Sequence, residues 1–275
     1  MASNTGRAGL ASDLVKIALT FDNLGEAADL ERGVWPADAP LGRHASVTTA
    51  LPRLLDELDA TGLRATFCLE AINCEMYPDA VRGVAARGHE VAMHGWRHEA
   101  WRELEPRRED DLLARGRAAF AALGIGVAGF RPPGGELPPE GATSLERHGF
   151  TWCSALGTRR ERTCALAQVP FAWGLVDAYL RLDSFAARRT EHGDPDAALT
   201  PDETATAILG RLAAGAPPTL ILHPFLMVDD DGWAAARRVL HALADGVRRR
   251  TAPVATAGEI AAALERAARP DPRVT

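Results

Sequence analysis

The chain has few cysteines and no long apolar run. It contains four Cys in 275 residues, and no two of them form a Cys-x-x-Cys pair. The spacing therefore indicates neither a disulfide framework nor a cysteine-based zinc site. Cys68 and Cys153 lie in apolar runs, so we expect them to be buried thiols. No apolar stretch approaches the roughly 20 residues that cross a bilayer, which predicts a protein without a membrane partner.

The chain also lacks an excess of positive charge. Its 31 Lys and Arg stand against 37 Asp and Glu, giving a net charge of −6, and the basic residues are dispersed. A nucleic-acid-binding protein would show a basic stripe, so we expect no nucleic acid partner. The first 16 residues lack the basic start and apolar core of a secretory signal. We therefore expect a cytoplasmic protein with a small intracellular substrate, and homo-oligomerisation stays open.

What the chain does have is a regular alternation of two patterns. Apolar runs of strand length span residues 15–21, 65–69, 91–93, 127–130, 150–153, 219–222 and 253–256. Amphipathic stretches of helical length span 48–61, 78–87, 107–123, 138–148, 201–214, 232–250 and 257–268. Residues 24–45 and 157–168 are expected to be loops. This alternation predicts an α/β chain with a mainly parallel sheet covered by helices, and about seven such units fit one barrel.

The alternation also predicts how the chain is divided. We expect an N-terminal extension at residues 1–14, a single barrel domain at 15–268 and a C-terminal tail at 269–275. No low-complexity linker or internal repeat interrupts the middle segment.

Polar side chains stand where the predicted strands end. Asp22 and Asn23 end the first strand, His94 follows the third, Arg131 follows the fourth and His223 ends a late one. In a parallel barrel the catalytic groups sit at the carboxyl ends of the strands. The shared position therefore predicts one active site, and it is stronger evidence than any of the motifs alone.

His94 and His98 stand four positions apart and can close on one metal ion. Chance supplies such a pair in roughly one chain in four or five of this histidine content, so the pair alone is weak evidence. Neutral imidazoles suit zinc or a similar metal, and a catalytic zinc usually has a third protein ligand. Asp22 and Asn23 are the natural source of that oxygen ligand.

Other candidates have ordinary alternatives. Arg131 lies in a Pro/Gly-rich turn and is either a surface residue or a guanidinium aimed at a carboxylate. Asp177 is either its partner or an isolated surface residue. His223 precedes Pro224 after four apolar residues, so a core histidine is the alternative to a catalytic one. The cluster Asp229-Asp230-Asp231 favours the capped start of a helix over a metal site.

Taken together, these motifs resemble those of the polysaccharide deacetylase family, whose domain is also called the NodB homology domain. The resemblance runs from about Val15 to Ala267. It rests on Thr20-Phe21-Asp22-Asn23 for Thr-Phe-Asp-Asp, on His94 and His98, on Arg131, Pro133 and Gly135, on Trp173 with Asp177, and on Leu220, His223 and Pro224.

The resemblance implies a distorted (β/α) barrel of the NodB type that hydrolyses an acyl amide with a divalent metal, zinc above all. Carried over, Asp22 is the general base, Arg131 orients it, and His223 is the general acid. His94, His98 and the residue at position 23 hold the metal. Asp177 is grouped with the catalytic residues. The substrate pocket is expected to involve Trp96, Pro133, Gly134, Trp173 and His44. The 24–45 loop, with His44, Trp35 and Glu26, is either a lid over the site or a solvated loop.

The main departure from the family pattern is Asn23, where the family has Asp. Its amide oxygen can bind a metal more weakly than a carboxylate, as in similar family members that deacetylate peptidoglycan sugars. Alternatively Asp22 becomes the third ligand and leaves the base unassigned, or the metal is lost as in allantoinase-like relatives. The family's Asp-Ser pair after the fourth motif is also changed, to Cys153-Ser154.

The function expected first is N-deacetylation of a small amino-sugar or secondary-metabolite intermediate. A hydrolase of a cyclic amide, ureide or imide is the alternative, because the same attack on a C–N bond would open a ring. A non-catalytic binding protein on the same scaffold is the third possibility. The substrate is therefore an acylated amine or a cyclic amide.

Overall fold

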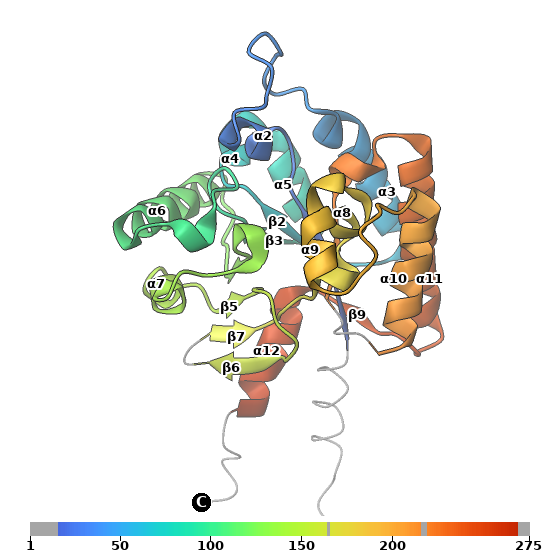
Figure 1. The fold of residues 1–275 in the computed structure, drawn as a ribbon. Helices are drawn as coiled ribbons and strands as arrows, with labels where there is room; N and C mark the ends of the chain where they lie inside the picture. Colours follow the sequence, from blue (N-terminus) through green and yellow to red (C-terminus); the bar gives the residue numbers. More distant parts are fainter. Residues whose placement is uncertain (1–15, 164–165, 216–218, 269–275) are drawn as a thin grey trace, which may run out of the picture.

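A single twisted sheet organises the chain in the computed structural model, which describes residues 16–163, 166–215 and 219–268. Figure 1 shows the sheet inside a shell of helices. The nine strands of the described residues are β1 (Ile17–Asp22), β2 (Thr66–Leu69), β3 (Glu90–Met93), β4 (Gly129–Phe130), β5 (Trp152–Cys153), β6 (Glu161–Thr163), β7 (Leu166–Gln168), β8 (Thr219–Leu222) and β9 (Val254–Ala255).

The strands follow the order β6-β7-β5-β4-β3-β2-β1-β8, and β9 also pairs with β1. From β7 to β8 every pairing is parallel, and only β6 and β7 run antiparallel. These seven parallel strands form a curled half-barrel. The expected distorted (β/α) barrel with about seven parallel strands is therefore confirmed.

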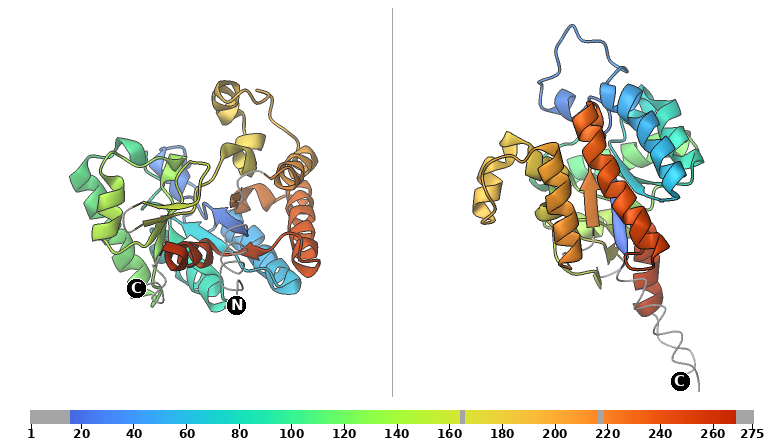
Figure 2. Two further views of the ribbon diagram at one scale, coloured as in Figure 1. Left: turned by 90° about the horizontal axis from the view of Figure 1, so that it is seen from below. Right: turned by 90° about the vertical axis from the view of Figure 1, so that its right-hand side faces the viewer.

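Helices connect most of the successive parallel strands and cover the outside of the sheet, as the views of Figure 2 show. They are α2 (Ala27–Glu31), α3 (Leu51–Thr61), α4 (Asn73–Met76), α5 (Pro78–Ala86), α6 (Pro106–Ala122), α7 (Gly141–Arg147), α8 (Asp177–Arg181), α9 (Ala186–Glu191), α10 (Pro201–Ala213), α11 (Asp230–Arg248) and α12 (Ala257–Ala268). In the part of the chain that the structure describes, no helix has the length and apolar character needed to span a membrane.

The sequence explains the longer helices. Leu51, Leu54 and Leu58 repeat at helical spacing, and all three are buried on the inner face of α3. Gly62 ends α3 with a φ of 70°, a left-handed conformation that glycine adopts without a Cβ clash. Asp229 accepts a hydrogen bond from the backbone N–H of Gly232 at 2.6 Å. The predicted capping role of the acidic cluster before α11 is thus confirmed.

Two predicted loops contain regular structure. Residues 157–168 were expected to be a charged loop, but β6 and β7 form an antiparallel hairpin there. β6 is an edge strand that pairs only with β7, and its first residue, Glu161, is exposed, so the segment lacks the continuous apolar run that marks a buried parallel strand. The 24–45 segment contains the short helix α2. The proposed extension 1–14, residue Val15 of the first predicted strand, Cys164 and the proposed tail 269–275 lie outside the described residues.

The cysteines of the described residues are reduced. Cys68, Cys74 and Cys153 are free and buried. Burial raises the pKa of the Cys153 thiol to about 12, so it stays protonated at neutral pH. The expectation of buried thiols at Cys68 and Cys153 is confirmed.

Candidate active site

The carboxyl ends of the parallel strands surround a cavity of about 580 Å³. Of the residues predicted for the site, those that line it are Asp22, Asn23, His94, His98, Arg131, Pro133, Gly134, Trp173 and His223. They come from β1, from the loops after β3, β4 and β8, and from the segment after β7. Residues as far apart in the sequence as Asp22 and His223 therefore meet at one edge of the sheet.

Arg131 is the best-anchored charge of the site, with only 1% of its surface exposed. Its Nη1 donates to Asp22 Oδ1 at 2.5 Å and to Thr20 Oγ1 at 2.8 Å. Its Nε and Nη2 both donate to Ser154 Oγ, at 3.2 and 2.9 Å. The guanidinium is thus held from two strands, and one oxygen of Asp22 is held with it.

The charge state of Asp22 follows from this pairing. Burial alone would raise the pKa of the carboxyl group, but the positive charge of Arg131 opposes this, with smaller contributions from His94 and His223. The net effect lowers the pKa of Asp22 below its usual value. Asp22 is therefore a carboxylate at neutral pH although it is buried.

His223 forms the second buried pair, with Asp177. The Nδ1–H of His223 donates to Asp177 Oδ1 at 2.5 Å, and the backbone N–H of His223 donates to Oδ2 at 2.9 Å. Burial alone would lower the pKa of the imidazole, but the carboxylate beside it raises the pKa above its usual value. Asp177 was expected to partner Arg131 or to lie alone on the surface. Both expectations were wrong, because the start of α8 places Asp177 beside β8 rather than β4.

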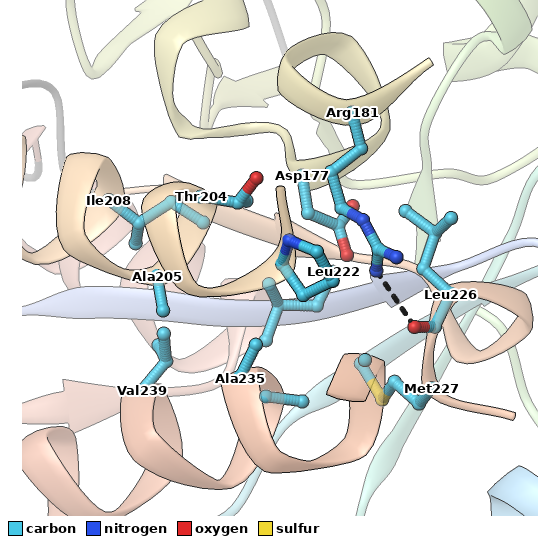
Figure 3. Close-up of a pocket in the computed structure, with 13 residues that line it drawn as sticks. Asp177, Arg181, Thr204, Ala205, Ile208, Leu222, Leu226, Met227, Ala235 and Val239 are labelled. Carbon is cyan, nitrogen blue, oxygen red and sulfur yellow. Dashed lines mark hydrogen bonds between the residues drawn. The ribbon is translucent and has the colours of Figure 1, made fainter. Parts of the chain in front are cut away.

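Figure 3 shows what lies behind Asp177. A small cavity of about 20 Å³, with room for about one water molecule, is lined mainly by apolar side chains such as Ile208, Leu222 and Val239. Arg181 closes one side by donating to the carbonyl oxygen of Leu226 at 2.9 Å. This apolar backing keeps the local dielectric low, which strengthens the interaction between Asp177 and His223.

His94 and His98 face each other across 5.0 Å between ring centroids. The Nδ1–H of His94 donates to the carbonyl oxygen of Arg131 at 2.8 Å, so its Nε2 is the nitrogen left for a ligand. Burial lowers the pKa of His94, and burial together with the neighbouring His94 and Arg32 lowers the pKa of His98 to about 3. Both rings are neutral at neutral pH, which is the form that binds a metal.

Asn23 lines the same cavity as the two imidazoles and carries an amide oxygen. Its Oδ1 is buried and has no hydrogen-bond partner among the described residues. The residue adopts a left-handed φ of 60°, which asparagine tolerates better than most residues. A buried acceptor without a donor is unusual, and a cation would satisfy it. Two imidazoles and this oxygen therefore fit a divalent metal.

The same geometry bears on the alternative in which Asp22 is the third ligand. Within the described residues, no three His, Cys, Asp or Glu side chains are placed to hold a metal together. Asp22 is instead turned toward Arg131. The arrangement thus favours Asn23 as the oxygen donor and leaves Asp22 available as a base.

The cavity wall differs from the predicted one at two positions. Trp96 does not line the cavity; it is buried, and Arg115 stacks on its ring with Cζ 3.6 Å from the ring centroid. His44 also lies elsewhere, because its Nδ1 bonds Ser46 Oγ at 2.8 Å and its backbone N–H donates to Tyr77. Glu26 accepts from Tyr77 and from the backbone of Gly42, so the 24–45 loop is anchored through residues expected to form a lid.

The turn after β4 does form part of the wall. Gly134 and Gly135 have φ values of 76° and 88°, which favour glycine. A Cβ on Gly135 would lie 2.8 Å from Cζ of Phe171, which packs against this turn. Pro133 and Gly134 line the cavity as predicted, and the turn that carries them packs against Phe171 at Gly135, where only glycine fits.

Sequence reasoning missed several residues around the site. Ser154 accepts hydrogen bonds from Arg131 and directly follows β5. Its position at the end of a strand is the signal that could have identified it. Glu99 accepts the backbone N–H groups of Trp96 and Arg97 and so shapes the turn between the two histidines. Glu70 follows β2 at the same edge of the sheet. Burial raises its pKa to about 8, so Glu70 is mostly neutral at pH 7.

Comparisons with known proteins agree with this architecture. A family model described as polysaccharide deacetylase matches residues 14–153, more than half of the 275 residues. The peptidoglycan deacetylase-like protein FGM2 of Gibberella zeae is 30% identical over 107 residues, which are 38% of this chain. The match spans 32% of that relative's length.

Two crystal structures share the fold over nearly the whole chain. A protein described as a polysaccharide deacetylase from Mycobacterium smegmatis gives a TM-score of 0.78 at 24% identity, covering 93% of this chain and 94% of that one. PuuE allantoinase gives a TM-score of 0.71 at 16% identity, covering 94% and 93%. The matched residues and the shared half-barrel place this chain in the polysaccharide deacetylase family.

Proposed function

We propose that this chain is a metal-dependent hydrolase of a carbon–nitrogen bond that removes the acyl group from a small N-acylated amine. The observation that carries the proposal is that a candidate base and a candidate acid, each held by its own partner, line the same cavity. A carboxylate held by Arg131 and an imidazole held by Asp177 face two neutral imidazoles and a free amide oxygen. Membership of the deacetylase family supports an acyl amide as the bond that is cleaved.

Asp22 acts as the general base in this proposal. Its lowered pKa keeps it ionised, and Arg131 fixes one carboxylate oxygen and so orients the group. Asp22 takes a proton from the water molecule that attacks the acyl carbonyl. Proton transfer by such a positioned group typically contributes about 10²- to 10⁴-fold in rate.

His223 acts as the general acid. Asp177 binds Nδ1–H, so Nε2 is the position from which a proton reaches the substrate. The raised pKa keeps the imidazole protonated over a wider pH range. His223 gives this proton to the departing amine nitrogen, which otherwise would leave as a poor, negatively charged group.

The metal would be held by His94, His98 and Asn23. A divalent ion such as zinc would polarise the acyl carbonyl and make a water molecule more acidic there. All three side chains are neutral, so we expect weaker binding than at a site with a carboxylate ligand. The charge of Asp22 beside the site compensates for part of this difference.

The size of the cavity supports a small substrate. Its volume of about 580 Å³ lies within the range of small-molecule sites. An amino sugar or a secondary-metabolite intermediate is therefore proposed rather than a long polymer.

A cyclic amide, ureide or imide hydrolase is the second candidate. Phe171, Trp173 and Phe225 contribute flat apolar surfaces to the cavity, and these suit a planar ring. The same base and acid would open a ring C–N bond and release no acetate. PuuE allantoinase has the same fold.

One set of measurements separates these functions. Metal content of the purified protein is measured, and activity is assayed before and after chelation on N-acetylglucosamine 6-phosphate, N-acetylphenylalanine, allantoin and hydantoin. We expect bound zinc, acetate release that chelation abolishes, and recovery when zinc is restored. Ring opening without acetate would favour the second candidate. Activity that resists chelation rejects metal dependence, and the absence of both metal and turnover would favour a binding protein on this scaffold.

A further inference from the structure

The cavity has an unbalanced set of charges away from the reacting groups. Its carboxylates are each engaged: Asp22 pairs with Arg131, Glu31 pairs with Arg97 at 3.2 Å, and Glu99 accepts two backbone N–H groups. Two further arginines line the same cavity, Arg32 and Arg188. Neither has a carboxylate within ion-pair distance in the part of the chain that the structure describes. The cavity therefore offers positive charge without an internal counterpart.

Arg188 is the better placed of the two. It lies on α9 and is half-buried, and its Cζ lies 4.8 Å from the ring centroid of Trp173. Stacking on an aromatic face holds a guanidinium in place while leaving its N–H edges free. Arg32 is exposed just after the end of α2, and its Nε donates to the carbonyl oxygen of Ala28 within that helix.

Trp173 is the centre of an apolar wall beside Arg188. Its ring contacts Phe171 at 5.4 Å and Phe185 at 5.5 Å between centroids, and all three residues line the cavity. The indole Nε1–H is buried without an acceptor among the described residues. Trp173 and Phe185 belong to the segment of residues 173–191, which Figure 2 shows standing out from the sheet near α10.

We propose that the cavity binds N-acylated amines that also carry an anionic group, a carboxylate or a phosphate, and that Arg188 binds this anion. Trp173 packs against the ring or apolar body of the same substrate. The inference rests on the deacylase function proposed above and names the class of its substrate. A planar guanidinium suits both anions because its paired N–H groups match two oxygens of either.

Matched substrate pairs test the proposal. N-acetylglucosamine 6-phosphate is compared with N-acetylglucosamine, and N-acetylphenylalanine with N-acetylphenylalaninamide. We expect kcat/KM to favour the charged member of at least one pair by about 10- to 100-fold, the range of a charge-assisted hydrogen bond. A preference in the sugar pair indicates a site for phosphate, and a preference in the phenylalanine pair indicates a site for carboxylate.

Variants assign the preference to a residue. Arg188→Gln is expected to abolish it by lowering kcat/KM on the charged substrate while leaving the uncharged one nearly unchanged. Arg188→Lys keeps the charge and should retain part of the preference. Arg115→Gln is the matched control, because Arg115 also stacks on a tryptophan, outside the cavity, and should change neither. A preference that survives Arg188→Gln but disappears in Arg32→Gln would overturn the assignment.

A binding measurement keeps this inference distinct from the proposed function. Phenylacetate and phenylacetamide are titrated by calorimetry into the wild type and into Arg188→Gln. Tighter binding of phenylacetate that is lost in the variant supports the anion site even if no substrate is turned over, in which case the deacylase proposal alone fails. Turnover with equal kcat/KM for charged and uncharged partners, together with equal binding, rejects the anion site and leaves the deacylase proposal standing.

Discussion

At the amino end of the sheet, Glu90 accepts hydrogen bonds from neutral donors. At the carboxyl end, the buried carboxylates of Asp22 and Asp177 instead bond to Arg131 and His223. Glu90 Oε2 accepts from Thr66 Oγ1 at 2.6 Å and from the backbone N–H of Gly258 at 2.9 Å, and Oε1 accepts from Trp152 Nε1 at 3.2 Å. Thr66 in turn accepts from the N–H of Ala257. One side chain thereby ties β2, β3 and β5 to the start of α12, which crosses this end in Figure 2.

The carboxyl end keeps groups that folding alone does not require. Asn23 and His98 both have left-handed φ values, 60° and 72°, and Asn23 Oδ1 lacks a partner among the described residues. Buried ion pairs such as Asp22–Arg131 contribute little net stability, because desolvation offsets most of their attraction. The contrast indicates that the amino end is organised for stability and the carboxyl end for chemistry. His89 is an exception at the amino end, since neither ring nitrogen has a described partner.

The largest effect should come from Asp22→Asn. Removing the base is expected to lower kcat/KM for deacylation by about 10²- to 10⁴-fold. The variant also leaves Arg131 buried without its carboxylate, so unfolding in urea is measured beside steady-state rates. If a folded Asp22→Asn variant kept the wild-type rates, Asp22 would not be the base and the carboxyl end of the sheet would not be the site of the chemistry.

The next effect concerns metal affinity at Asn23. Asn23→Ala should weaken zinc binding by at least the roughly 10- to 100-fold that loss of an outer partner causes. Asn23→Asp should strengthen it, because a carboxylate adds charge and Asp also tolerates a left-handed φ. Competition with a chelator measures both. If the two variants bind zinc as the wild type does, Asn23 is not a ligand.

A smaller effect, on stability alone, is expected from Glu90→Ala. Three donors would lose their acceptor, so the free energy of unfolding should fall by about 1–3 kcal/mol. Urea denaturation measures this change, and kcat/KM should stay nearly constant because Glu90 lies at the opposite end from the cavity. Glu75→Ala, which removes an exposed partner of Arg115 at 3.6 Å, serves as control and should stay within about 0.5 kcal/mol. A loss of activity without a loss of stability would contradict the division between the ends.

The smallest effect is a shift in pH dependence from Asp177→Asn. The protonated form of His223 is required, and its pKa is raised by Asp177 against the effect of burial. Without that charge burial lowers the pKa, so the alkaline limb of the kcat/KM profile should move to lower pH. The acid limb reports Asp22, whose lowered pKa depends mainly on Arg131, and should stay in place as an internal control. An unmoved alkaline limb would show that His223 is not the acid.

Much of the fold and site could be predicted because the signals are local. Strand and helix periods depend on neighbouring residues, and a polar residue at the end of an apolar run marks the catalytic edge of a parallel sheet. Asp22, His94, His98, Arg131 and His223 were identified this way, and all line one cavity. The β6–β7 hairpin escaped prediction because its strands are only three residues long and the segment around them is rich in charged residues, so no apolar run marks it.

By itself, then, the sequence determined the order of strands and helices and which residues stand at the strand ends. The tertiary structure decided which of them face each other: Asp177 pairs with His223 and not Arg131, and Trp96 packs under Arg115 outside the cavity. It alone brought Arg188, from a segment without a strand, onto the cavity wall. The physical reason is that pairing depends on the direction a side chain takes once distant segments pack together, and no spacing within a single segment encodes that direction.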